Sequence, residues 1–306
     1  MHIPDGFLST PVWFALDVTS ALSVGALARR TERTMEEGHV PLLGVMGAFV
    51  FAAQMINFPV GAATSGHLVG SALLASALGP GAATIVMTAI LLVQALVFQD
   101  GGLLALGANV FNMALVGVWA GYLPFHYLAA GKWRRVGVFL GGVLSVLAAS
   151  CLAIAELRLS GVPMPAAVVG LSMGLFLVSA MIEGGITVAV FFAVERMNAQ
   201  WVRSGPSAPM RMRGLLGAVA VLLASLGALV ASDLPDGLEK LADSLGIAGR
   251  SINLLVSPLA EYEIQATANP WLRKAGAGLV GLAVIFAACV AAGRLLTSRR
   301  GTRGAD

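Results

Sequence analysis

The feature that most constrains this chain is a succession of long apolar segments separated by short polar ones. Of its 306 residues, 58% are hydrophobic and 11% are charged, and the mean hydropathy is +0.85. Apolar runs with so few charges are typical of helices that cross a bilayer. The chain contains only 3 Tyr and 5 Trp, whereas membrane barrels use aromatic girdles. We therefore predict an all-α, polytopic protein of the lipid bilayer.

The apolar segments predict nine membrane spans, seven in an amino-terminal body and two in a carboxy-terminal module. They cover about 10–29, 40–58, 65–79, 80–99, 103–124, 135–157, 164–195, 213–232 and 275–296. The Pro- and Gly-containing segment 201–212 is typical of a linker. We therefore predict a body at 1–200, a cytoplasmic linker at 201–212 and a module at 213–306 with an outer loop at 233–274.

The basic residues predict the orientation of these spans. With the amino terminus outside, the segments that face the cytoplasm hold 14 of the 19 Lys and Arg residues. Cytoplasmic loops carry such an excess. We predict a multi-pass protein of the cell inner or plasma membrane, with its amino terminus outside and its carboxy terminus in the cytoplasm. The net charge of +3 reflects these loops, so we expect no nucleic-acid partner.

The amino terminus, MHIPDGFLST, carries a candidate metal chelate. The α-amine of Met1, the deprotonated backbone nitrogen of His2 and its ring Nδ1 can close two fused rings around one metal ion. The predicted topology places His67, at the start of the third span, on the same membrane face, where its ring can supply a fourth nitrogen. A planar set of four nitrogens favours Ni(II) or Cu(II), and Co(II) is compatible with it. The alternative is a solvated terminus with His67 as a packing residue.

Several other polar residues are candidates to support this site. Those near the outer ends of the spans are Gln54, Asn57, Thr64, Ser65, Asp100 and Asn109. Ordinary capping and interhelical hydrogen bonding are the alternative for each of them. Asp17 and Glu183 lie within predicted spans, where acids are functional candidates by default. The Pro4-Asp5-Gly6 sequence predicts a turn that directs the terminus back into the protein.

Two further patterns concern partners. Gly44, Ala48 and Ala52 share one face of the second span, where small residues allow either a partner subunit or another helix of this chain to approach closely. The segment GAATSGHL lacks the Lys and Ser/Thr of a phosphate-binding loop, and we predict no strand before it. The sequence therefore shows no nucleotide-hydrolysis motif, and we expect any ATP-driven step to belong to a partner.

Two other function classes are open alternatives. A self-sufficient channel or ion-coupled carrier would be expected to show inverted repeats or several intramembrane charges along a path. A membrane enzyme with a metal at the outer face would need an open coordination position and a general base.

Several stretches carry a resemblance to a known family. "MHIPDGFLS", "VPLLGVMGAFVFAAQMINFPV", "TSGHLVGSALLA", "LVQALVFQDGGLLALGANVFNM" and "EGGIT" resemble the CbiM/NikM family over residues 1–200. This family comprises the substrate-binding (S) components of cobalt and nickel energy-coupling factor (ECF) transporters. The tail, with "SDLPDGLEKLADSLGIAG" and "SPLAEYEI", resembles the PDGLE domain, which is related in role to the CbiN/NikN subunits.

The resemblance implies a function and a set of partners. It implies capture of Co(II) or Ni(II), as transported substrate with no prosthetic group, by the Met1 amine, the backbone and ring nitrogens of His2 and the His67 ring. It also implies a transmembrane coupling (T) subunit and paired cytoplasmic ABC ATPases. One position departs from the family: many relatives have His where this chain has Phe176, seven residues before Glu183. The metal is left open, and neighbouring genes for cobalamin synthesis, or for urease and hydrogenase, would distinguish cobalt from nickel.

Overall fold

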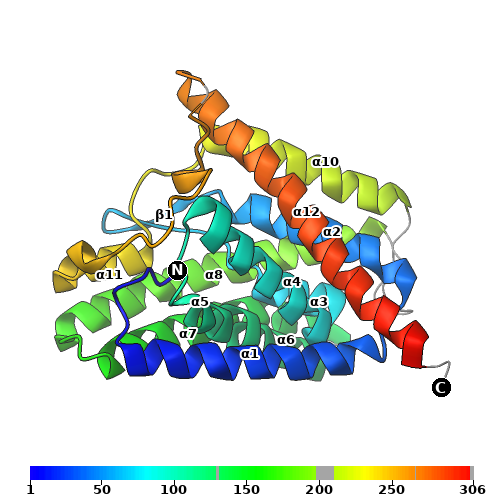
Figure 1. Ribbon diagram of the computed structural model, residues 1–306, viewed down its shortest axis with the longest axis horizontal. Coiled ribbons are helices and arrows are strands. Elements are labelled where there is room, and N and C mark those ends of the chain that lie inside the picture. The colour runs from blue at the N-terminus through cyan, green and yellow to red at the C-terminus, as the bar shows by residue number, and fades with distance from the viewer. Residues whose placement is uncertain (129–130, 198–209, 266, 304–306) are drawn as a thin grey trace.

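The chain forms a bundle of helices, and its amino terminus lies inside the outline of the bundle, in the left half of Figure 1. The computed structural model describes residues 1–128, 131–197, 210–265 and 267–303. The body contains α1 (Thr10–Glu32), α2 (Val40–Gln54), β1 (Phe58–Gly61), β2 (Thr64–Gly66), α3 (Ser71–Leu78), α4 (Pro80–Val93), α5 (Leu106–Asn109), α6 (Val118–Leu128), α7 (Arg134–Leu159) and α8 (Ala166–Met197). The tail contains α10 (Met210–Leu226), α11 (Gly237–Leu245) and α12 (Pro270–Arg303). Most of the predicted linker 201–212 lies outside the described residues.

Short helical turns complete these elements. Two π-helical segments continue the longer helices: η2 (Gln94–Phe98) follows α4, and η3 (Val110–Gly117) joins α5 to α6. The 3-10 turns are η1 (Glu37–His39), η4 (Gly131–Trp133), η5 (Gly227–Leu229), η6 (Ala248–Arg250) and η7 (Ala260–Tyr262).

Seven helical segments of the described chain are long and apolar enough to cross a membrane, which confirms the predicted class of helical membrane protein. They are Thr10–Glu32, Pro80–Phe98, Leu106–Leu128, Gly131–Leu159, Ala166–Arg196, Met210–Leu229 and Pro270–Ser298. The second and third predicted spans are shorter helices. Thirteen of the 15 residues of α2 are buried. The apolar side chains of α2 therefore pack inside the protein, and contact with lipid is not needed to account for them.

The segment before α3 is a β-hairpin rather than the beginning of a helix. Phe58 pairs with Gly66 and Pro59 with Ser65 in an antiparallel ladder. The two turn residues, Ala62 and Ala63, both have positive φ angles, of 47° and 53°. Such angles at both central positions suit the twist of a tight hairpin. The prediction that no strand precedes residues 61–68 was therefore wrong. His67 lies between β2 and α3, not at the beginning of a span.

The tail helices pack against the centre of the body. Both α10 and α12 contact α2, and α12 crosses in front of it in Figure 1. A Cβ atom built on Gly44 would lie 2.7 Å from Val290 and 2.8 Å from Phe286 of α12. Of the two alternatives for the small-residue face of α2, the structure shows packing within the chain, because α12 covers Gly44.

This packing predicts opposite effects for two Gly→Ala substitutions. Gly44→Ala should lower the free energy of unfolding by about 1–3 kcal/mol, because the added methyl group overpacks the α2–α12 contact. Gly25→Ala, on α1, adds a methyl group that meets nothing within 4 Å. It should leave stability unchanged or raise it by up to about 1 kcal/mol, because Ala favours helix. Thermal unfolding of both purified variants measures the difference, and equal melting temperatures would contradict it.

Candidate metal site at the amino terminus

The first residues of the chain are buried in the bundle, where hydrogen bonds to their backbone hold them in place. Ile3 is fully buried. Its backbone N–H donates to Oδ1 of Asn109 at 2.8 Å, and its carbonyl accepts from Nδ2 of the same side chain at 3.0 Å. Gly102 donates a further backbone hydrogen bond to the Ile3 carbonyl at 2.9 Å. Asn109 therefore fixes the position of the chain one residue after His2.

A turn after Ile3 directs the chain out of this position. The Asp5 carboxylate accepts hydrogen bonds from the backbone N–H groups of Leu103, Leu104 and Ala105. Gly6 has a φ of 90°, and a Cβ atom there would lie 2.0 Å from the backbone oxygen of Arg250. The structure thus places a turn at the predicted Pro4-Asp5-Gly6 sequence, and glycine is required in it.

The Met1 amine lies between a body residue and a tail residue. Its nitrogen is 2.7 Å from Nε2 of His67 and forms a close ion pair with the Asp236 carboxylate. Two nitrogens bound at right angles to one metal ion, each about 2.0 Å from it, lie about 2.8 Å apart. The Met1 and His67 nitrogens therefore already have the separation of neighbouring ligands in a planar site.

The His2 ring stacks beside the His67 ring, and one of the two nitrogens of the His2 ring has no hydrogen-bond partner within the described residues. The ring centroids are 5.6 Å apart and the ring planes differ by 4°. Nδ1 of His2 contacts Oδ1 of Asp100 at 2.9 Å. The His2 side chain is only 5% exposed, and its Nε2 has no hydrogen-bond partner within the described residues. A buried ring nitrogen without a partner costs free energy unless something binds it.

His67 is held in one tautomer by the backbone that follows it. Its Nδ1 lies 3.0 Å from the carbonyl oxygen of Leu68. A carbonyl oxygen only accepts, so Nδ1 carries the proton and Nε2 presents a lone pair to the Met1 amine. Burial, followed by the charge of the amino terminus, lowers the pKa of His67. The neutral ring is the form that binds a metal.

A chain of polar side chains runs from His2 to the backbone of Val69, two residues after His67. Gln54 donates to the carbonyl of Val69 at 2.8 Å and accepts from Gln94 at 3.1 Å. Gln94 also donates to the Tyr262 hydroxyl, which donates to Asp100 at 2.5 Å. Burial raises the pKa of Asp100, but His2 and the Tyr262 hydroxyl outweigh burial and hold it below its usual range. Asp100 therefore remains a carboxylate that anchors the His2 ring.

The tail supplies Asp236 through the PDGLE sequence itself. Asp236 caps α11: its Oδ1 accepts from the backbone N–H groups of Leu238 and Glu239, and Glu239 bonds back to the Asp236 N–H. Its second oxygen, Oδ2, contacts the Met1 amine. Burial raises the pKa of Asp236, but the amino terminus and His67 outweigh burial and hold it well below its usual range. From the sequence, Asp236 is only one residue of the predicted outer loop 233–274, although Asp-x-x-Glu before a helix is a capping-box pattern.

The remaining candidates occupy supporting positions. Ser65 donates to the carbonyl of Leu234, and its N–H donates to that of Pro235, so the hairpin holds the segment that leads to Asp236. Asn57 accepts a backbone hydrogen bond from Ser232. The buried Thr64 hydroxyl bonds to Ala62 within the hairpin. These three residues shape the surroundings without contacting His2 or His67 within the described residues.

Cavities lie at both ends of the bundle, and one of them opens onto this site. It has a volume of about 380 Å³, runs between body and tail, and is lined by His67, Asp100, Asp236, Glu239 and Tyr262 among others. The side chains that line it include five carboxylates, of Asp100, Asp233, Asp236, Glu239 and Glu261, and one amine, that of Lys274. This lining attracts cations.

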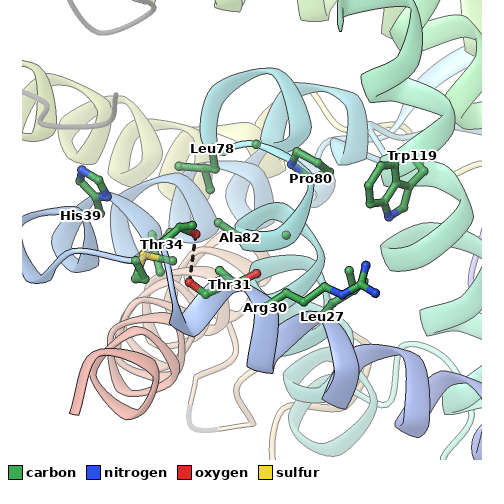
Figure 2. Close-up of a pocket in the computed structure, with 13 residues that line it drawn as sticks. Leu27, Arg30, Thr31, Thr34, His39, Leu78, Pro80, Ala82 and Trp119 are labelled. Atoms are coloured by element: carbon green, nitrogen blue, oxygen red, sulfur yellow. Dashed lines mark hydrogen bonds between the residues drawn. The ribbon is translucent and has the colours of Figure 1, made fainter. Parts of the chain in front are cut away.

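The cavity at the other end has a different chemistry. Figure 2 shows it between the end of α1 and the α3–α4 turn, with His39 on one side and Trp119 on the other. Burial lowers the pKa of His39, the one histidine that lines it. Within the described residues, no group of three or more His, Cys, Asp or Glu side chains is placed to hold a metal ion there or elsewhere.

A helical membrane bundle with a buried, nitrogen-rich site beneath a negatively lined cavity has the architecture of a transporter for a transition-metal ion. Comparison with known sequences gives the family. The chain belongs to the family of the cobalt uptake substrate-specific transmembrane region, CbiM, whose profile matches residues 2–201. A second profile, that of the PDGLE domain, matches residues 211–298.

Individual relatives agree with this assignment. The fused nickel transport protein NikMN of Rhodobacter capsulatus is 28% identical, with 98% of this chain and 100% of that protein aligned. The cobalt transport protein CbiM of Acetoanaerobium sticklandii is 33% identical over 62% of this chain and 83% of its own length. A crystal structure of a truncated transition metal transporter matches with a TM-score of 0.57 and 30% identity, covering 64% of this chain and 99% of the other. Proteins of this type transport cobalt or nickel.

Proposed function

We propose that this chain captures Co(II) or Ni(II) at the outer membrane face as the substrate-specific subunit of an ATP-driven ECF importer. The ligands are the Met1 amine, the backbone nitrogen and Nδ1 of His2, and Nε2 of His67. The observation that carries the proposal is the 2.7 Å separation between the Met1 nitrogen and His67 Nε2, which come from opposite ends of a 66-residue interval.

The contacts of the proposed ligand nitrogens indicate which interactions a metal ion would have to replace. Nδ1 of His2 contacts Asp100, so the ring has to release this carboxylate to complete the chelate. The Met1 amine has to lose a proton, because a metal ion binds the free amine. The carboxylates of Asp100 and Asp236 then lie beside the bound cation and balance its charge. Asn109 holds the Ile3 backbone throughout and keeps the first two residues in register.

The resemblance to ECF components supports the proposed partners. We infer a transmembrane coupling subunit and paired cytoplasmic ATPases, with the amino terminus of this chain outside and its carboxy terminus inside. The acidic cavity between body and tail would then face the outer medium and deliver hydrated cations to His67. Relatives named for nickel and for cobalt both match this chain. Either metal accepts a set of nitrogen ligands.

The proposal predicts that this chain alone binds the metal ion but does not transport it. The chain alone in proteoliposomes should bind one equivalent of labelled nickel or cobalt without accumulating it. Accumulation against a gradient should require the coupling subunit, the ATPases and hydrolysable ATP. The matched control is the same complete assembly with a non-hydrolysable ATP analogue. Equal uptake by the chain alone would instead indicate a self-sufficient channel or carrier.

A further inference from the structure

Glu183 is a buried acid in α8 that none of the functional assignments above uses. Its side chain is fully buried, and both of its oxygens accept backbone hydrogen bonds. Oε2 accepts from the N–H of Val69 at 2.7 Å, and Oε1 accepts from the N–H of Gly70 at 2.8 Å. Its partners are therefore the residues that follow His67 in the chain.

The peptide bond between Leu68 and Val69 connects Glu183 to the His67 ring. Its N–H donates to Glu183, and its carbonyl accepts from Nδ1 of His67 at 3.0 Å. Because the two groups belong to one planar unit, fixing the N–H also fixes the direction of the carbonyl. Hydrogen bonds in such a chain polarise and strengthen one another in a low-dielectric interior.

The rest of this segment is also fixed by close packing. Gly70 has a φ of 79°, and a Cβ atom there would lie 2.5 Å from Val50 of α2. A Cβ atom on Gly66 would lie 2.6 Å from the Ser179 hydroxyl of α8, one turn before Glu183. Gln54 holds the Val69 carbonyl at 2.8 Å. Segment 66–70 is thus packed between α2 and α8, and the Glu183 carboxyl group anchors it from α8.

We propose that Glu183 is a positioning residue for metal capture, which holds the 68–69 peptide so that His67 keeps its proton on Nδ1 and presents Nε2 to the metal. This inference rests on the proposed function, because it treats His67 as a ligand. Supporting groups that fix the tautomer of a ligating histidine commonly change metal affinity by about 10–100-fold when they are removed. Glu183 acts on the metal only through the backbone and His67.

The test compares two Glu→Gln substitutions in the full chain. Glu183→Gln keeps the shape of the side chain but turns an NH2 group toward one of the two backbone donors. It should weaken Ni(II) binding by about 10–100-fold. Glu156→Gln is the matched control, because Glu156 is also a buried intramembrane acid, 4% exposed, and accepts from Asn112 instead. The control should bind Ni(II) as the unchanged chain does.

A second readout separates positioning from general destabilisation. In the metal-free, unsubstituted chain labelled with ¹⁵N-histidine, His67 should show the Nδ1–H tautomer, with its signals identified by their loss in His67→Ala. In Glu183→Gln the ring should populate both tautomers, while in Glu156→Gln it should keep one. An Nε2–H tautomer in the unsubstituted chain overturns the proposal even if Glu183→Gln does not fold.

The other possible results separate a failure of the role proposed for Glu183 from a failure of the proposed metal-binding function. Unchanged affinity and an unchanged tautomer in Glu183→Gln, with binding lost in His67→Ala, would overturn the role of Glu183 alone. Weakened affinity with an unchanged tautomer would also overturn it. Normal binding by His67→Ala would instead overturn the proposed ligand set.

Discussion

A removable extension fused in front of Met1 should abolish tight metal binding, and cutting it off directly before Met1 should restore binding. The fusion converts the terminal amine into an amide and leaves every side chain in place. It also has no room, because the Met1 nitrogen is enclosed by His67 and Asp236 and the Met1 side chain is only 9% exposed. We expect affinity to fall by about 10³-fold, which corresponds to about 4 kcal/mol.

Equilibrium dialysis with labelled nickel before and after cleavage measures this effect on one preparation. The control carries the same extension at the carboxy terminus and should bind as tightly as the cleaved chain. If the fused and cleaved forms bind equally well, the terminal amine is not a ligand and the proposed chelate is wrong.

Substitution of His67 should have the second largest effect. His67→Ala removes one of the four proposed nitrogens, so affinity should fall by more than the roughly 100-fold that loss of a supporting group costs. The bundle should still fold, because His67 lies in a connection between β2 and α3 rather than within a helix. Added imidazole should recover part of the binding by occupying the vacated position.

His126→Ala is the matched control for this substitution. The His126 ring lies on α6, where its Nδ1 is 3.4 Å from the Tyr122 hydroxyl in an exposed contact. The control removes the same number of atoms and should leave affinity unchanged. Retained high affinity in folded His67→Ala would show that His67 is a packing residue.

The sequence predicted that Met1 and His67 lie on one face of the membrane, and the structure brings them into contact, but their surroundings were not predicted, for a physical reason. The chelate depends on consecutive atoms of Met1 and His2, so it can be recognised without knowing the fold. His67 required only the topology of the spans before it. Asp236 and Tyr262 complete the site from the tail, however, and reach residues that lie more than 160 positions away in the chain. Local patterns carry no information on contacts at such separations.

The same limit applies to the fold. Long apolar runs identified the seven long helices, because the length of a membrane span follows from bilayer thickness. The apolar runs gave no sign of the hairpin at residues 58–66, whose turn is formed by Ala62 and Ala63 in left-handed conformations. Alanine gives no turn signal, and residues with side chains seldom adopt such angles. Cross-strand pairing and contact with Pro235 stabilise a conformation that propensity argues against.

The pairing of Met1 with Asp236 determines at which stage of synthesis and folding the candidate site can form. Met1 pairs with a residue that is synthesised 235 positions after it, and Asp100, which contacts His2, pairs with Tyr262, 162 positions after Asp100. Long-range contacts of this kind are the slowest to form, because their loop entropy is lost before they stabilise anything. The candidate site is therefore completed late in synthesis and folding, because a partly synthesised chain lacks the contacts that Asp236 and Tyr262 make.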